Sequence, residues 1–230
     1  MSAPAGPGQV PSAVAGLARL AEDLLRGRGA LAPGDGPLPT ARLVTLVLVC
    51  GGLHGLVMGS FAGGLGALYA ALKIPLLLLL APALCLPSFR VVHAVLGLAD
   101  DLPAARRAVL AGQATLAVSL AALSPVLALV VLSSDHYHLV KLVNGALFLL
   151  ASLAAQLTVA RHYRPLLARD GRHRWALAIW PTLYLFVALQ LGYALRPFVG
   201  HPGFPTEFLR EDWMGNVYLD LWWALRGVLG

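Results

Sequence analysis

The sequence predicts an all-α polytopic membrane helix bundle, with about five transmembrane helices and an amphipathic interfacial helix near each end of the chain. Of the 230 residues, 58% are hydrophobic and only 12% are charged, and the mean hydropathy is +0.75. A helix needs about 20 apolar residues to cross a bilayer, so a chain of this length has room for about five spans. All of the acidic residues fall outside the long uncharged stretches. The bilayer is therefore the expected environment.

The first 40 residues differ from the rest in being rich in Ala, Pro and Gly, which predicts a cytoplasmic leader (1–40) rather than a span. Within it, apolar residues recur at helical spacing over 12–26, and Gly27 and Gly29 follow as stop signals. A short amphipathic helix at the membrane surface is expected there. No basic residue precedes an apolar run near the start, so no signal peptide is predicted.

Residues 41–196 form the predicted membrane domain. We expect its five spans at 43–72, 75–98, 108–132, 142–160 and 175–195. The Lys73–Ile74–Pro75 step is read as the turn after the first span, and prolines 75, 82 and 87 predict a broken or kinked second helix. Residues 161–174 are the most basic predicted loop, and its arginines are expected to contact lipid head groups: Arg161, Arg164, Arg169, Arg172 and Arg174.

The orientation follows from the distribution of Lys and Arg. With five spans, eleven of these residues fall on the side of the N-terminus and five on the other, with Arg90 unassigned. The positive-inside rule then places the N-terminus in the cytoplasm and the C-terminus outside, in what we expect to be a bacterial cytoplasmic membrane.

The last segment, 197–230, begins with an irregular stretch rich in Pro and Gly and continues as a predicted amphipathic helix. Its aromatic residues are expected at the membrane interface: Trp213, Tyr218, Trp222 and Trp223.

Small residues recur at a four-residue step through the predicted first span. The series is Gly51, Gly55, Gly59, Gly63, Ala67 and Ala71. Residues four apart share one helix face, and a face without side chains lets another backbone approach closely. The partner is either another span of the same chain or a second copy in a homo-oligomer, and a channel lining is a third, less favoured reading.

Several polar residues fall within apolar stretches. They are His54, Arg90, His93, Gln113, Asn144, Gln156 and Gln190. An intramembrane ionisable side chain is a functional candidate by default, although interhelical hydrogen bonds explain a neutral His or an amide equally well. Ligation of a haem by His54 and His93 and anion binding by Arg90 are the two sharper hypotheses.

The sequence contains no recognisable catalytic, phosphate-binding or metal motif, and no cofactor is predicted. Its basic residues flank apolar runs, so they indicate lipid contact and no nucleic acid partner. The expected function is therefore a non-enzymatic membrane scaffold or accessory subunit, with a homo-oligomer or other membrane subunits as partners. The alternatives are a small-solute transporter or channel using the broken second helix and Arg90, and a haem-binding redox subunit.

Three short motifs carry a resemblance. They are Lys73-Ile74-Pro75 continuing to Cys85-Leu86-Pro87-Ser88, then Leu195-Arg196-Pro197-Phe198, and Gly215-Asn216-Val217-Tyr218. With these motifs the chain resembles a group of uncharacterised bacterial multi-span membrane proteins over residues 43–230, and the resemblance implies architecture but no activity. In its predicted topology the chain is also similar to the Yip family of membrane-trafficking scaffolds.

Overall fold

The computed structural model describes residues 13–33, 38–196, 198–200, 208–209 and 215–219. The long helices, in chain order, are α1 (Ala13–Arg26), α2 (Thr40–Gly59), α3 (Gly64–Val95), α4 (Leu102–Ser133), α5 (Tyr137–Arg169) and α6 (His173–Leu195). Three 3-10 turns join them: η1 (Gly29–Leu31), η2 (Ser60–Ala62) and η3 (Ala99–Asp101). The five helices after α1 are long and apolar enough to cross a membrane. The predicted all-α membrane bundle is confirmed.

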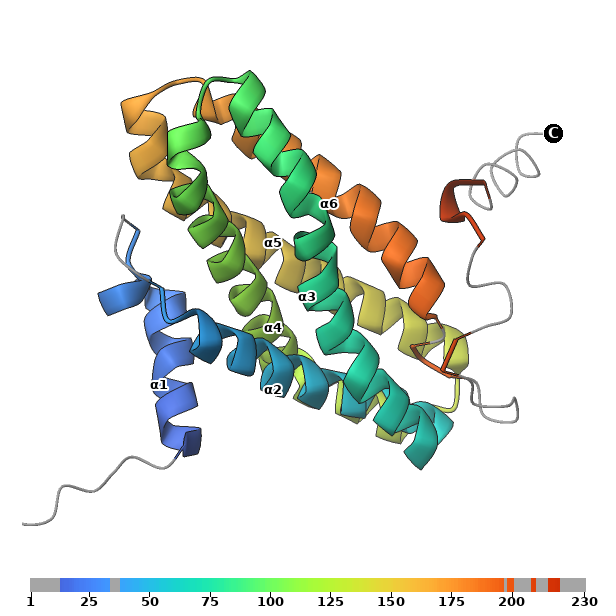
Figure 1. Cartoon of the computed structure of the whole chain (residues 1–230). Coiled ribbons are helices and arrows are strands. Elements are labelled where there is room, and N and C mark those ends of the chain that lie inside the picture. Colours follow the sequence, from blue (N-terminus) through green and yellow to red (C-terminus); the bar gives the residue numbers. More distant parts are fainter. Residues whose placement is uncertain (1–12, 34–37, 197, 201–207, 210–214, 220–230) are drawn as a thin grey trace, which may run out of the picture.

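The helix α4 lies at the centre of the bundle. Every residue from Ala111 to Val118 is buried, because α2 and α5 pack closely against α4. The helix α3 pairs mainly with α2 and α6 (Figure 1). Successive spans run antiparallel with short connections between them, so alternate connections lie at the same end of the bundle (Figure 1).

The amphipathic helix α1 packs on α4 and α2, and its Leu24 is fully buried. The end of α1 and the chain after it are attached to the bundle by side chains that donate to backbone carbonyls. Arg161 donates to Leu25 O at 3.2 Å, and Arg107 donates to Ala32 O at 2.9 Å. The α1 helix matches the predicted helix within one residue at its start, and it lies against the ends of two spans.

The predicted first span, 43–72, is wrong at its second end. The helix α2 ends at Gly59, and the chain reverses through η2 and Gly63, whose φ of +96° is a conformation that favours glycine. The sequence 64–72 therefore opens α3. The Lys73–Pro75 step is no turn, and Lys73 is buried inside α3. Hydropathy does not reveal this reversal because the turn residues are themselves uncharged.

Of the predicted broken or kinked second helix, the break is wrong. The helix α3 runs through Pro75, Pro82 and Pro87 for 32 residues without interruption. Proline is tolerated within a membrane helix because neighbouring groups can satisfy the backbone carbonyl it frees. Two connections are shorter than predicted: α4 begins at Leu102, and the basic stretch is helical as far as Arg169.

Of the predicted C-terminal helix, Trp213, Trp222 and Trp223 lie outside the described residues, whereas Tyr218 is described and contacts α6. Its ring stacks on Phe186 with centroids 4.3 Å apart, and its hydroxyl donates to the Phe186 carbonyl. The Gln190 amide donates to Gly215 O at 2.8 Å and accepts from Val217 N at 3.2 Å. Desolvation in this contact raises the pKa of Tyr218.

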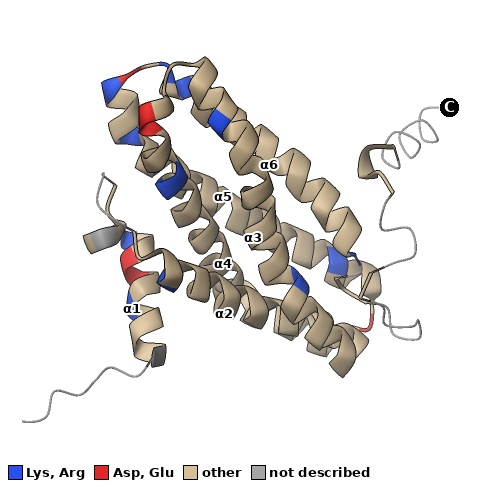
Figure 2. Cartoon of the chain, viewed as in Figure 1, with Lys and Arg blue, Asp and Glu red and all other residues tan. Residues whose placement is uncertain are grey.

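Basic side chains gather at one end of the bundle, beside α1 and the α5–α6 connection (Figure 2). We call this the arginine end. It holds Arg42, Arg106, Arg107, Arg161, Arg164, Arg169, Arg172 and Arg174. Toward the opposite end, the described basic residues are Lys73, Lys141 and Arg196. The described Lys and Arg residues are therefore concentrated at one end of the folded bundle. Which side of a membrane that end faces stays a prediction.

Candidate functional site

The glycines of α2 face α3 within the same chain. A Cβ added at Gly55 would lie 2.3 Å from the Ala70 carbonyl oxygen, and one at Gly59 would lie 2.3 Å from that of Gly66. At Gly51 the nearest atom, in Leu78, would be 3.4 Å away. The backbones of α2 and α3 therefore meet along these glycines, and α3 occupies this face.

The prediction that all six small residues share one face of one helix is wrong. Gly63 is exposed in the turn, and Ala67 and Ala71 belong to α3. Because the chain reverses at Gly63, Ala71 comes to lie opposite Gly55, where its Cα would be 2.8 Å from an added Cβ. The small residues spaced four apart are thus shared between α2 and α3, which form a helical hairpin.

His54 is a buried polar junction between three helices. Its Nδ1 lies 3.1 Å from Leu120 O and 3.0 Å from Ser124 Oγ on α4, and its Nε2 lies 3.3 Å from Asn144 Oδ1 on α5. Both ring nitrogens have partners within the bundle. Bonds of this kind join membrane helices without requiring a ligand.

His93 belongs to a different cluster near the arginine end. Its Nδ1 lies 2.9 Å from Phe89 O, and its Nε2 lies 3.5 Å from the Tyr163 hydroxyl on α5. The partners of the two histidines on α5, Asn144 and Tyr163, are 19 positions apart, or about 28 Å at 1.5 Å per residue. One iron cannot reach both rings, so shared haem ligation by His54 and His93 is wrong.

The remaining predicted polar residues do not converge on one site. Gln113 on α4 accepts from the Tyr184 hydroxyl of α6 at 3.3 Å, whereas Gln190 binds the chain near Tyr218. Gln156 is half-buried on α5. Arg90 is exposed on an uninterrupted helix and so lines no break, and anion binding by Arg90 stays a prediction.

Three of the five arginines expected at lipid head groups form hydrogen bonds or ion pairs within the chain. Arg161 bonds to the α1 end, Arg169 lies 3.5 Å from Asp101 Oδ1, and Arg172 donates to Leu96 O at 2.7 Å. Arg172 also pairs with Asp170 and holds the pKa of that carboxyl at about 2, below its usual range. Arg164 is exposed, and Arg174 lies over the Trp175 ring.

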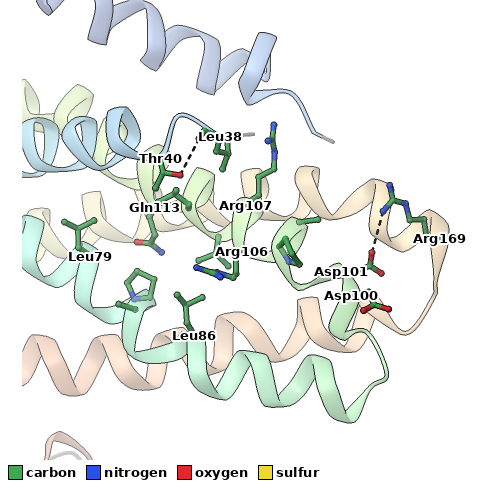
Figure 3. Close-up of a pocket in the computed structure, with 16 residues that line it drawn as sticks. Leu38, Thr40, Leu79, Leu86, Asp100, Asp101, Arg106, Arg107, Gln113 and Arg169 are labelled. Carbon is green, nitrogen blue, oxygen red and sulfur yellow. Dashed lines mark hydrogen bonds and ion pairs between the residues drawn. The ribbon is translucent and has the colours of Figure 1, made fainter. Parts of the chain in front are cut away.

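A cleft of about 720 Å³ separates α3 from α4 at the arginine end (Figure 3). Its walls are mostly apolar on α3 and mixed on α4. The lining residues are Leu38, Thr40, Leu79, Pro82, Ala83, Leu86, Asp100, Asp101, Pro103, Ala104, Arg106, Arg107, Val109, Leu110, Gln113 and Arg169. Figure 3 shows Leu79 and Gln113 at one end of the cleft, Leu86 and Arg106 near its middle, and both aspartates beside Arg169 at the other end.

The charges along the cleft differ in how they are neutralised. Asp101 is held by Arg169 and by the buried His173, whose Nε2 lies 3.0 Å from Asp101 Oδ2. Arg107 turns away to the Ala32 carbonyl. Neither Arg106 nor Asp100 forms an ion pair with any residue that the structure describes. The cleft therefore offers one guanidinium and one carboxylate to whatever occupies it.

The fold and this cleft define a polytopic α-helical membrane protein with an amphipathic cleft at the charged end of its bundle. Comparison with known proteins adds no relative, because no family model, curated protein or solved structure matches the chain. The resemblance to bacterial multi-span proteins stays a prediction.

Sequence reasoning missed the cleft residues Asp100, Asp101 and Arg106, which fall between the predicted spans 75–98 and 108–132. One signal was available: these charges border a span, and Pro103 two residues after Asp101 is typical of the first turn of a helix. That pattern places them at a helix start. The separation of α4 from α3 there has no signature in the sequence.

Proposed function

We propose that the protein is a non-enzymatic membrane scaffold or accessory subunit that holds a phospholipid in the cleft between α3 and α4. The observation that carries this proposal is the position of Arg106, exposed inside a cleft whose α3 wall is apolar. A guanidinium binds phosphate through charge-assisted hydrogen bonds, and the apolar wall accommodates an acyl chain. A phospholipid carries both chemistries in one molecule.

The position of the cleft in the bundle supports a lipid over a soluble anion. Arg106 lies among the arginines of the end that the positive-inside rule assigns to the cytoplasmic head groups. From Arg106 the cleft extends along α4 to Gln113, about 10 Å deeper at 1.5 Å per residue. The apolar side chains Leu79 and Leu110 line the deeper part. A head group at Arg106 would leave its chain in the hydrocarbon layer.

The experiment compares Arg106→Gln with Arg164→Gln. Arg164 is the matched control because it is exposed on α5 at the same end but does not line the cleft. Native mass spectrometry of each variant, released from mild detergent with added phosphatidylethanolamine and phosphatidylglycerol, counts bound lipid. Loss of a charge-assisted bond should weaken lipid binding about tenfold in Arg106→Gln alone.

Equal lipid binding by both variants and the wild-type protein would overturn the proposal. An equal loss in both variants would show that the charge of the whole arginine end, and no defined cleft, attracts the lipid. The melting temperature of each variant in detergent checks that the fold is retained.

A further inference from the structure

We propose that the cleft selects a phospholipid with a primary amine in its head group, with phosphate at Arg106 and the ammonium at Asp100. This inference rests on the proposed function and adds the class of lipid. It depends on the order of chemical groups along the cleft, on the two charges that lack an ion-pair partner among the described residues, and on the hydrogen-bonding capacity of a carboxylate.

The order of the lining residues follows the order of groups in such a lipid. From the deep end outward, Figure 3 shows Leu79 and Gln113, then Arg106, then Asp100. An aminophospholipid presents, in the same direction, its acyl chain and ester, its phosphate and its amine. Gln113 is buried, with its carbonyl oxygen occupied by Tyr184, so its amide nitrogen is the group able to donate to an ester carbonyl.

The outer end of the cleft carries two carboxylates with different surroundings. Asp101 already receives Arg169 and His173, so its charge is compensated within the chain. Asp100 borders the same cleft and has no ion pair with a described residue. A head group whose only charge is its phosphate would leave this carboxylate without a cation. A zwitterion satisfies both Arg106 and Asp100.

The nature of the cation follows from the hydrogen bonds it can donate. A primary ammonium donates to a carboxylate and attracts it as an ion, whereas a quaternary trimethylammonium has no N–H to donate. The cleft wall near Asp100 contains Pro103 and Ala104 but no aromatic side chain among its lining residues, so no cation–π cage for a quaternary ammonium is present in this described pocket. Ethanolamine is therefore favoured over choline.

The experiment measures phosphatidylethanolamine, phosphatidylcholine and phosphatidylglycerol in competition on the full chain by native mass spectrometry. Four proteins are compared: wild type, Asp100→Asn, Arg106→Gln, and Asp135→Asn as an exposed carboxylate control between α4 and α5. Wild type and Asp135→Asn should favour the ethanolamine lipid over the choline lipid about tenfold, as one charge-assisted bond predicts. In Asp100→Asn this preference should fall to near equality, because binding of the ethanolamine lipid falls more than binding of the choline lipid.

The outcomes separate the two proposals. An unchanged ethanolamine preference in Asp100→Asn, or no such preference in the wild type, overturns the amine assignment. If binding of all three lipids still depends on Arg106 in that case, the phospholipid cleft itself stands. If Arg106→Gln binds every lipid like wild type, the proposed function fails and the amine assignment fails with it.

Discussion

Two faces of α3 differ in how closely they pack against the neighbouring helices. One face, which includes Gly66, Ala70 and Leu78, is buried against α2 at backbone contact. The other, which includes Leu79 and Leu86, borders a cleft of about 720 Å³ in front of α4. Both faces are apolar, so hydropathy does not distinguish them.

The difference lies in what the partner helix presents. The helix α2 offers Gly55 and Gly59, and without Cβ atoms the two backbones approach until carbonyls and glycine carbons touch. The helix α4 offers Arg106, whose charge would be costly to bury without a partner. We infer that the small residues of α2 allow α2 and α3 to pack closely, and that the Arg106 guanidinium keeps α3 and α4 apart. The α2–α3 contact is therefore structural, whereas the α3–α4 cleft is available to a ligand.

The largest expected effect comes from disrupting the close contact between α2 and α3. Gly55→Ala would place a Cβ 2.3 Å from the Ala70 oxygen, so the two helix backbones must move apart. We expect a loss of about 2–4 kcal/mol of unfolding free energy, at or above the usual range for overpacking because the obstacle is backbone. Unfolding in mixed micelles with increasing sodium dodecyl sulfate measures it.

Gly52→Ala is the matched control for this substitution. It lies on the same helix, and its added Cβ would be 3.6 Å from the Ala71 oxygen, an ordinary contact. The change should alter the unfolding free energy by less than about 1 kcal/mol, within the helix-propensity difference between Gly and Ala. Similar losses in the two variants would show that α2 and α3 do not meet along Gly55.

The next effect comes from filling the open cleft. Ala83 is exposed on α3 and lines the cleft, so Ala83→Trp should occupy the space proposed for an acyl chain. We expect bound phospholipid to fall about tenfold, which corresponds to roughly 1.4 kcal/mol. Leu84→Trp, on an exposed neighbouring position that does not line the cleft, should retain the lipid. Retention by both variants would place the lipid elsewhere.

Much of the fold was predictable because each span extends over an uncharged stretch long enough to cross a bilayer. The errors in the helix boundaries arose where hydropathy does not reveal the path of the backbone. Gly63 reverses the chain inside an uncharged stretch, and Pro75 looks like a turn although α3 continues through it. Because the chain reverses at Gly63, the small residues predicted to lie on one helix are divided between α2 and α3.

The candidate site was less predictable than the fold, since it depends on distances between helices. The sequence marked Gln113 as a polar residue of the third span, and the structure places it at the deep end of the cleft. Arg106 was counted only toward topology, because a basic residue next to a span fits the positive-inside rule without any further role. Its neighbours across the cleft, such as Leu86, are on another helix, and no spacing along one chain reveals that.

A smaller effect is expected at the polar junction around His54, away from both faces of α3. Asn144→Leu removes the partner of His54 Nε2 but leaves the contacts of Nδ1 with α4. The loss should be about 0.6 kcal/mol of unfolding free energy, the mean for hydrogen bonds between membrane helices, and no more than about 1.7 kcal/mol. Gln156→Leu, half-buried on the same helix, is the control. An equal change in both variants would mean that His54 Nε2 contributes nothing specific.

The smallest expected effect tests the connection that closes the arginine end beyond the cleft. Arg172 donates to the Asp170 carboxylate at 2.7 and 2.9 Å and also to Leu96 O, so it links the α5–α6 connection to the end of α3. This pairing lowers the folded-state pKa of Asp170 to about 2, against an ordinary value near 3.9. The stabilisation is therefore complete above about pH 4 and is lost as the pH falls from about 4 to about 2.

Asp170→Asn should remove that part of the pH dependence, and Arg172→Gln should remove it too while also deleting the bond to Leu96. Melting temperatures in detergent, measured across this acidic window, provide the comparison. The difference should be small because Asp170 is exposed and solvent screens the pair. If the wild-type protein and Asp170→Asn lose stability in parallel between about pH 4 and 2, the ion pair contributes nothing measurable, and the α3 end is held by the Leu96 bond and packing alone.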